Sequence, residues 1–266
     1  MGIESPSTYP WGNQRMATVA APAPEAPVSA NSVSRLFNVL FAPKATFESI
    51  AQRPTWLLPL IVLCLLSVGV IVTFSARGGW RSFMEKQDAT PKMQTRMEQM
   101  TPDQRQQMID NQVKFAPIFG YVGAAVFTFV GALIAAAVLL GVFNLMGGQK
   151  ITFGASLGIV SYAWTPYIIA SILAIVILLL KDPTTVDLQN VVASNPGVFA
   201  ADDAPKWLVA LLSSLDLFTL WVLVLLGFGY SATNPKKLSF GKAFTTVLAV
   251  WIIFVLIKVG FAAAFS

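Results

Sequence analysis

Residues 153–180, FGASLGIVSYAWTPYIIASILAIVILLL, form a stretch of 28 residues that contains no charged side chain. A helix needs about 20 apolar residues to cross the hydrocarbon core of a bilayer, so this stretch is long enough to span a membrane. Four more stretches meet the same requirement. The five expected spans are Trp56–Ser75, Pro117–Leu145, Phe153–Leu180, Trp207–Tyr230 and Lys242–Ala264. The sequence therefore predicts an all-α, polytopic membrane helix bundle with five transmembrane helices.

The composition of the whole chain supports the same class. Hydrophobic residues make up 55% of the 266 residues and charged residues only 12%, whereas soluble domains average about 25% charged residues. Trp56, Trp207 and Tyr230 fall at predicted span ends, where aromatic side chains favour the headgroup level. We therefore expect the lipid bilayer to be the main surroundings of this chain.

The residue types that are missing exclude several kinds of chemistry. The chain has no histidine and a single cysteine, Cys64, which excludes histidine-dependent catalysis and any cysteine cluster within one chain. The net charge of +5 is not gathered in a basic stripe interleaved with aromatic residues, so nucleic acid is not an expected partner. We predict a protein that is not an enzyme, with no catalytic residues, no cofactor and no metal site.

Three segments of different composition precede or interrupt the spans. Residues 1–30, rich in Pro and Ala, are expected to form a disordered tail. Residues 31–54 are amphipathic and lead into a membrane domain over residues 55–266. Within that domain, residues 76–116 form a hydrophilic connection with a helical pattern. Thr101 and Gln104 of this connection have the spacing of a capping box.

The amphipathic lead has two interpretations. Its apolar side chains recur at helical spacing, with Arg35 and Asn38 expected on the opposite side. Pro43 interrupts the pattern and is expected to start a second short helix. The lead is either a pair of helices lying at the membrane interface or a docking helix for a partner. The soft methionine face of the long connection (Met93, Met97, Met100 and Met108) likewise suits either packing or partner binding.

Two ionisable residues lie inside the predicted fourth and fifth spans, Asp216 and Lys258. A charge in a hydrocarbon interior costs on the order of 3 kcal/mol, so such residues usually have a partner or a task. Measured from the connection between the two spans, their depths differ by only about 4–5 Å. We predict an intramembrane ion pair between them; the alternatives are that Lys258 extends toward the interface, or that both line an ion or proton pathway.

The third span carries two further features that bear on packing. Gly154 and Gly158 form a GxxxG step, which lets helices approach closely, either within one chain or between two copies in a homo-oligomer. Pro166 removes a helical hydrogen bond and frees the carbonyl of Tyr162, and Thr165 is placed to compensate. The resulting kink serves either packing or a hinge or pore.

Short motifs around this span resemble the Yip1 family of membrane proteins. They are Gly147-Gly148-Gln149-Lys150-Ile151-Thr152-Phe153 and the Tyr162-x-x-x-Pro166 step, preceded by Arg53-Pro54 and Trp56-Leu57-Leu58-Pro59-Leu60. The resemblance implies five spans, a cytoplasmic N-terminus, an outward C-terminus and no known enzymatic site. The chain lacks the Asp-Leu-Tyr-Gly-Pro signature of eukaryotic members, so their Rab-binding role is not carried over.

From these observations we expect a non-enzymatic organiser or adaptor that acts through protein partners in the membrane. The alternative is a small ion- or solute-transporting protein that uses the Asp216–Lys258 region. Lys and Arg are almost evenly divided between the two sides of the membrane, so charge alone leaves the orientation open. The bacterial style of the motifs favours a prokaryotic plasma membrane.

Overall fold

The computed structural model describes residues 2, 31–88, 98–148, 150–182, 184–201 and 203–264. Within these ranges the secondary structure is helical, with no strand. Apart from Gly2, the tail predicted for residues 1–30 lies outside the described residues, as do Met93 and Met97. The helices are α1 (Ser32–Phe41), α2 (Pro43–Gln52), α3 (Leu57–Ala76), α4 (Trp80–Asp88), α6 (Pro102–Gly147), α7 (Phe153–Ala163), α8 (Thr165–Leu180), α9 (Lys206–Ser214), α10 (Leu217–Ala232) and α11 (Phe240–Ala264), with short 3₁₀ turns η1 (Leu188–Asn190) and η2 (Pro196–Phe199).

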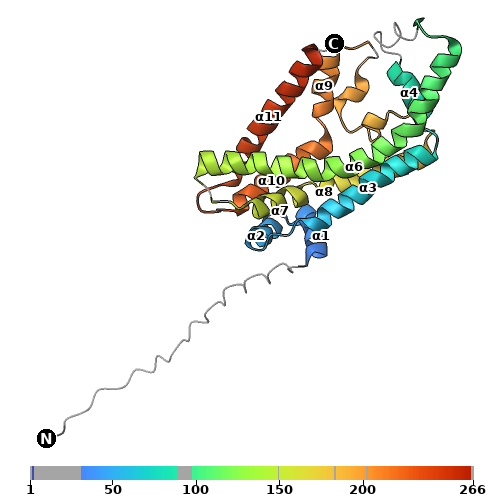
Figure 1. Ribbon diagram of the computed structural model, residues 1–266. Helices are drawn as coiled ribbons and strands as arrows, with labels where there is room; N and C mark the ends of the chain where they lie inside the picture. Colours follow the sequence, from blue (N-terminus) through green and yellow to red (C-terminus); the bar gives the residue numbers. More distant parts are fainter. Residues whose placement is uncertain are drawn as a thin grey trace.

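The membrane-spanning helices confirm the predicted class of fold. By length and composition, four of them can cross a bilayer: α3, α6, the continuous pair α7–α8, and α11. The fourth predicted span, Trp207–Tyr230, is not one straight helix, because α9 and α10 meet at a 50° bend. Counted as one broken span, this pair gives the five crossings that the sequence predicts (Figure 1).

The two short turns between spans lie on the same side as the N-terminal lead. Ala51 of α2 lines a small cavity with Lys150 and Thr233, and Lys44 lines another with Pro235. We call this the lead side. The connections after α3 and α8, together with the end of α11, belong to the opposite side, which we call the far side.

The lead helix α1 has the reverse orientation to the one that its pattern predicts. Arg35, expected to face outward, is only 1% exposed, and Val39 is fully buried beside it. Phe37 and Phe41 point outward with exposed fractions of 61% and 85%. The hydrophobic period of α1 is correct, but the tertiary contacts of Arg35 decide which face is buried.

Four hydrogen bonds explain the burial of the Arg35 guanidinium. It donates to the hydroxyl and the carbonyl of Ser49 (3.0 and 3.2 Å), to the carbonyl of Arg53 (3.0 Å) and to the Thr55 hydroxyl (3.1 Å). Ser49 and Arg53 lie in the last turn and at the C-cap of α2, where the helix dipole favours a cation. Arg35 therefore joins α1 to the end of α2 and to the short non-helical connection that leads into α3.

The same connection is joined to the middle of the bundle through Tyr162. The Thr55 and Tyr162 hydroxyl oxygens are 3.1 Å apart, and Tyr162 donates to the Ser32 carbonyl at 3.3 Å. Tyr162 is fully buried in α7. The lead is therefore an integrated part of the membrane bundle rather than a separate element beside it.

Helix α6 is the longest element and projects beyond the membrane on the far side. Its N-terminus has the predicted capping box of Thr101 and Gln104. Its 46 residues correspond to about 69 Å at 1.5 Å per residue, more than twice the hydrocarbon thickness. The helix continues through Pro117, so part of the predicted connection and the second span form one continuous helix, which bends between its first turns and its apolar part (Figure 1).

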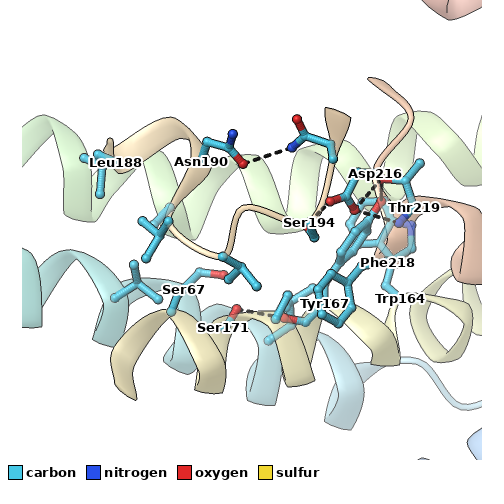
Figure 2. Close-up of a pocket in the computed structure, with 18 of the residues that line it drawn as sticks. Ser67, Trp164, Tyr167, Ser171, Leu188, Asn190, Ser194, Asp216, Phe218 and Thr219 are labelled. Carbon is cyan, nitrogen blue, oxygen red and sulfur yellow. Dashed lines mark hydrogen bonds between the residues drawn. The ribbon is translucent and has the colours of Figure 1, made fainter. Parts of the chain in front are cut away.

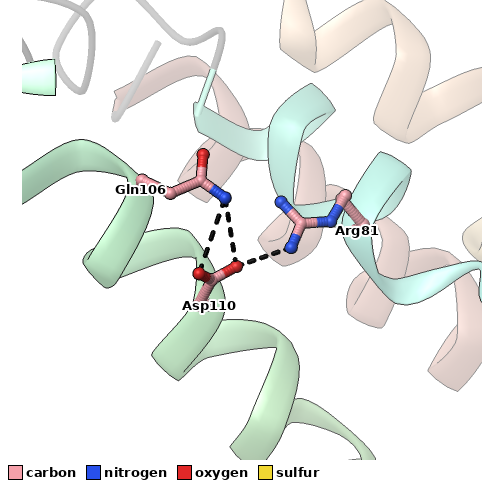
Figure 3. A network of polar contacts seen from close by, with 3 residues as sticks. All are labelled: Arg81, Gln106 and Asp110. Carbon is pink, nitrogen blue, oxygen red and sulfur yellow. Dashed lines mark hydrogen bonds and ion pairs between the residues drawn. The ribbon is translucent and has the colours of Figure 1, made fainter. Parts of the chain in front are cut away.

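Helix α4 is fixed against the projecting part of α6 by a small polar network. Arg81 of α4 forms an ion pair with Asp110 of α6 at 2.5 Å, and Gln106 donates to the same carboxylate at 3.3 Å (Figure 3). The ion pair is about half exposed, where such pairs contribute about 0–1 kcal/mol. Its role is to align the two helices more than to stabilise the fold.

Candidate functional site

The candidate site lies where the fourth span breaks. Helix α9 ends at Ser214 and α10 begins at Leu217, so Leu215 and Asp216 are not helical. Asp216 is the N-cap of α10, and its carboxylate accepts a hydrogen bond from the Thr219 amide at 2.9 Å. Asp is among the favoured N-cap residues, so a carboxylate in the middle of this span ends one helix and begins the next.

A pocket of about 580 Å³ opens beside this break. Its walls come from α3, α8, the first turn of α10 and the connection between α8 and α9 (Figure 2). Its polar lining consists of Ser67, Trp164, Tyr167, Ser171, Asn190, Ser194, Asn195, Ser213, Asp216 and Thr219. Among the described residues that line it, Asp216 is the single Asp, Glu, Lys or Arg.

Hydrogen bonds from the connection between α8 and α9 and from α10 converge on Asp216. The Ser194 hydroxyl donates to one carboxylate oxygen, and the Thr219 hydroxyl donates to the other at 3.2 Å. The hydroxyl oxygens of Thr219 and Tyr167 are 3.2 Å apart, and the Leu217 amide donates to the Ser194 carbonyl at 3.0 Å. The carboxylate is therefore held in one orientation at the wall of the pocket.

The connection that covers the pocket is itself ordered by side chains. The Asn195 amide group donates to the Asn190 side-chain oxygen at 2.9 Å, and the Asn195 oxygen accepts from the Gly197 amide at 3.0 Å. Gly197 lies so close to α9 that an added Cβ would be 2.6 Å from the Ser213 hydroxyl oxygen. Glycine at this position lets the connection close against α9.

The structure gives Asp216 and Lys258 different partners, which corrects the predicted ion pair. The Lys258 ammonium donates to the Ser214 hydroxyl at 3.1 Å, while the Asp216 carboxylate is engaged by Ser194 and Thr219. An ion pair joins Arg81 to Asp110 elsewhere in the structure. The helix break is the reason for the different partners, because it gives the carboxylate local donors. Lys258 still reaches the same break, at the last residue of α9.

The predicted packing residues of the third span have distinct surroundings. An added Cβ at Gly158 would be 3.0 Å from the Thr55 carbonyl oxygen, so this face of α7 is covered by the α2–α3 connection. Gly154 has open space around the corresponding position. Thr165 donates to the Tyr162 carbonyl at 2.6 Å, and Pro166 follows in the first turn of α8. The Thr165 hydroxyl thus supplies the hydrogen bond that Pro166 removes.

Sequence reasoning identified Asp216 but not the residues that surround it. Tyr167, Ser194 and Thr219 are distributed over a span, a connection and a half-helix, and no local spacing links them. The local signal was Ser213-Ser214-Leu215-Asp216, a polar interruption in an apolar run, which is typical of a helix end followed by an N-cap. The described residues contain no group of three or more His, Cys, Asp or Glu placed to hold a metal ion.

Comparison with known proteins gives one finding. The family model described as the Yip1 domain matches residues 37–261, which is most of the chain and includes the greater part of the lead and the whole pocket lining. No curated protein matches the sequence. No solved structure matches it either.

Proposed function

The chain belongs to the Yip1 family of multi-pass membrane proteins, and we propose that it acts without catalysis, as an organiser that binds another membrane protein. The observation that carries this proposal is the arm on the far side, formed by α4 and the first turns of α6. About 20 Å of α6, residues 102–114, precedes its apolar part at 1.5 Å per residue. A bilayer crossing does not require this length.

The arm carries an apolar groove of about 510 Å³. Its lining includes Trp80 and Met84 of α4, and Phe115 and Phe119 of α6. Phe119 is 76% exposed. Gln112 also lines the groove, and its buried side-chain oxygen accepts no hydrogen bond from the described residues. Buried polar atoms are nearly always paired, so a donor from a partner suits this position.

The occupant that fits the groove is a helix of a second membrane protein. The groove lies where α6 passes from polar residues to the apolar face that begins at Phe115, so an occupant contacts both lipid-level and water-level side chains. An amphipathic helix laid in an apolar groove is a common recognition mode. A partner helix that lies beside α6 and extends past the bilayer contacts the side chains at lipid level and those at water level.

A photo-cross-linking residue in place of Phe119 tests this proposal in native membranes. We expect a discrete cross-linked product of higher mass, because Phe119 lines the groove. The matched control is Leu256 of α11, another large side chain that is 64% exposed, and it should give no discrete protein product. Phe119→Ala should lower recovery of the same partner several-fold, and Leu256→Ala should not. Equal products from both positions, or lipid adducts alone, would contradict an organiser role.

We also infer that the protein lies in a prokaryotic plasma membrane with its lead side in the cytoplasm. The bacterial style of the family motifs supports the prokaryotic membrane, and the family resemblance supports this orientation, which puts the arm outside. Fusions to the two chain ends in a bacterial host test it: green fluorescent protein at the N-terminus should fluoresce, and alkaline phosphatase at the C-terminus should be active. The reverse pattern would place the arm in the cytoplasm.

The pocket beside Asp216 supports a second candidate, the movement of a small solute through the bundle. Broken spans whose half-helices meet near a buried polar site are a recurrent feature of secondary transporters. Purified protein in liposomes should then give a solute flux that falls in Asp216→Asn. Robust flux from protein recovered without any partner would favour this candidate over the organiser.

A further inference from the structure

We propose that the pocket at the α9–α10 break binds a small organic ammonium ion, with Asp216 as its counter-charge. The proposal concerns which ligand binds and not whether it crosses the membrane. It shares the pocket with the transport candidate above and rests on that candidate in no other respect. The pocket volume of about 580 Å³ falls in the range of sites for small organic molecules. A bare metal ion would leave most of that space empty.

The charge of the pocket selects for a cation. Asp216 is the single Asp or Glu among the described lining residues, and no Lys or Arg lines the pocket with it. Lys258 donates to Ser214, which is not a lining residue. A carboxylate inside the bundle is costly without a positive partner, and a bound ammonium supplies one.

The hydrogen bonds of Asp216 leave room for that partner. A carboxylate has about four acceptor positions. Three donors use them here: the Thr219 amide, the Thr219 hydroxyl and the Ser194 hydroxyl. One position is left for an N–H group of a ligand. The first amide groups of α10 place positive partial charge at the same break, and the last carbonyl groups of α9, which ends at Ser214, place negative partial charge there. The net charge of the site therefore comes from the Asp216 carboxylate.

Aromatic side chains complete the recognition of an organic cation. Trp164, Tyr167 and Phe218 all line the pocket and lie on the same side of it as Asp216 (Figure 2). The faces of such rings attract cations, and aromatic walls beside a carboxylate are typical of sites for alkylammonium groups. An ammonium with a short carbon chain satisfies the charge, the rings and the volume together.

The pocket is open to two sources of such a group. Ser67 and Ser171 belong to membrane-spanning helices, whereas Asn190 and Val191 belong to the far-side connection. Val191 packs against a cluster that contains Phe74 at the end of α3. The ligand is therefore either a free amine from the far side or the amine headgroup of a lipid.

Binding measurements on the full-length protein, purified in a maltoside detergent, test the proposal. Choline and ethanolamine are the probes, and 3,3-dimethylbutan-1-ol is the neutral analogue of choline with the same shape. We expect ethanolamine to bind through its N–H groups and its charge. Choline, whose quaternary ammonium has no N–H, should bind through its charge and the aromatic rings, and the neutral analogue should bind at least about tenfold more weakly than choline. Asp216→Asn should weaken amine binding by at least about tenfold, because Asn keeps the N-cap but removes the charge.

Two further variants separate binding from folding. Asp103→Asn removes an exposed carboxylate from the first turn of α6 and should leave amine binding unchanged. Tyr167→Phe keeps the ring and should retain most of the binding, whereas Tyr167→Leu should weaken it several-fold. Equal binding by wild type and Asp216→Asn would overturn the proposal, as would equal binding of choline and its neutral analogue.

Native mass spectrometry distinguishes the lipid source from the free amine. If the free amines do not bind but the wild type retains phosphatidylethanolamine that Asp216→Asn loses, the ligand is the lipid headgroup and the proposal holds. If neither the binding of free amines nor the retention of phosphatidylethanolamine depends on Asp216, the proposal fails. Amine binding without any liposome flux would reject the transport candidate, and the proposed ammonium site at Asp216 would stand. A liposome flux that depends on Asp216, with amine binding unchanged in Asp216→Asn, would support transport and reject the proposed amine site.

Discussion

Arg35→Met should lower the free energy of unfolding by about 3 kcal/mol or more, since hydrogen bonds to a charged group contribute about 1.5–3 kcal/mol each. The substitution leaves the Ser49 hydroxyl and carbonyl, the Arg53 carbonyl and the Thr55 hydroxyl without their buried donor. Arg35→Lys should be intermediate, because a single ammonium cannot reach acceptors that a planar guanidinium spans. Thermal unfolding of the wild type, Arg35→Met and Arg35→Lys in detergent measures these differences in stability.

The matched control for Arg35 is its own acceptor residue, Arg53. The Arg53 side chain is exposed, and its backbone carbonyl remains in Arg53→Met. That variant removes the same kind of side chain and should change stability by no more than about 0.5 kcal/mol. If Arg35→Met and Arg53→Met unfold at the same temperature, the buried hydrogen bonds of Arg35 do not fix the lead to the bundle.

Gly229→Ala is the second variant for which we expect a large loss of stability. An added Cβ would lie 2.3 Å from the Ile159 Cγ2 of α7 and 3.2 Å from the Phe47 ring of α2. Both neighbours are fully buried, so neither can move into open space. Overpacking of this kind costs about 1–3 kcal/mol, and we expect a value in the upper part of that range.

Gly154→Ala is the control for this effect, because it makes the same change in a helix of the same bundle. No atom lies within 4 Å of the added Cβ there, so stability should be unchanged or slightly raised. Ile159→Leu removes the methyl group that Gly229→Ala would strike, and the double variant should recover part of the loss. A Gly229→Ala protein as stable as Gly154→Ala would show that α10 does not pack against α7 and α2 as described.

The membrane class of this fold follows from the sequence because the bilayer imposes a length. Residues 153–180 are apolar for long enough to cross it, and the helix α7–α8 occupies that range. The capping box at Thr101 is equally local, since Thr101 and Gln104 satisfy each other within one turn. Features of this kind depend on neighbours along the chain, and the sequence contains all of them.

The charged residues depend on neighbours far away in the sequence. Arg35 is on the polar side of an amphipathic pattern, but acceptors from residues 49–55 draw it inward. Helix geometry predicts similar depths for Asp216 and Lys258 and a pair between them, yet the carboxylate binds Ser194 and the ammonium binds Ser214. Periodicity describes one helix at a time, so it does not indicate which donor or acceptor faces a charge.

The sequence by itself thus determined that this protein is a helical membrane bundle and where its long apolar stretches lie, because lipid requires long runs of apolar residues with their backbone bonds satisfied internally. The tertiary structure alone decided that the fourth span breaks at Asp216 and that a pocket opens there. A helix break becomes favourable when the freed backbone groups find partners. Here the Leu217 amide donates to the Ser194 carbonyl of a connection that folds against α10, and the Thr219 amide donates to the Asp216 carboxylate.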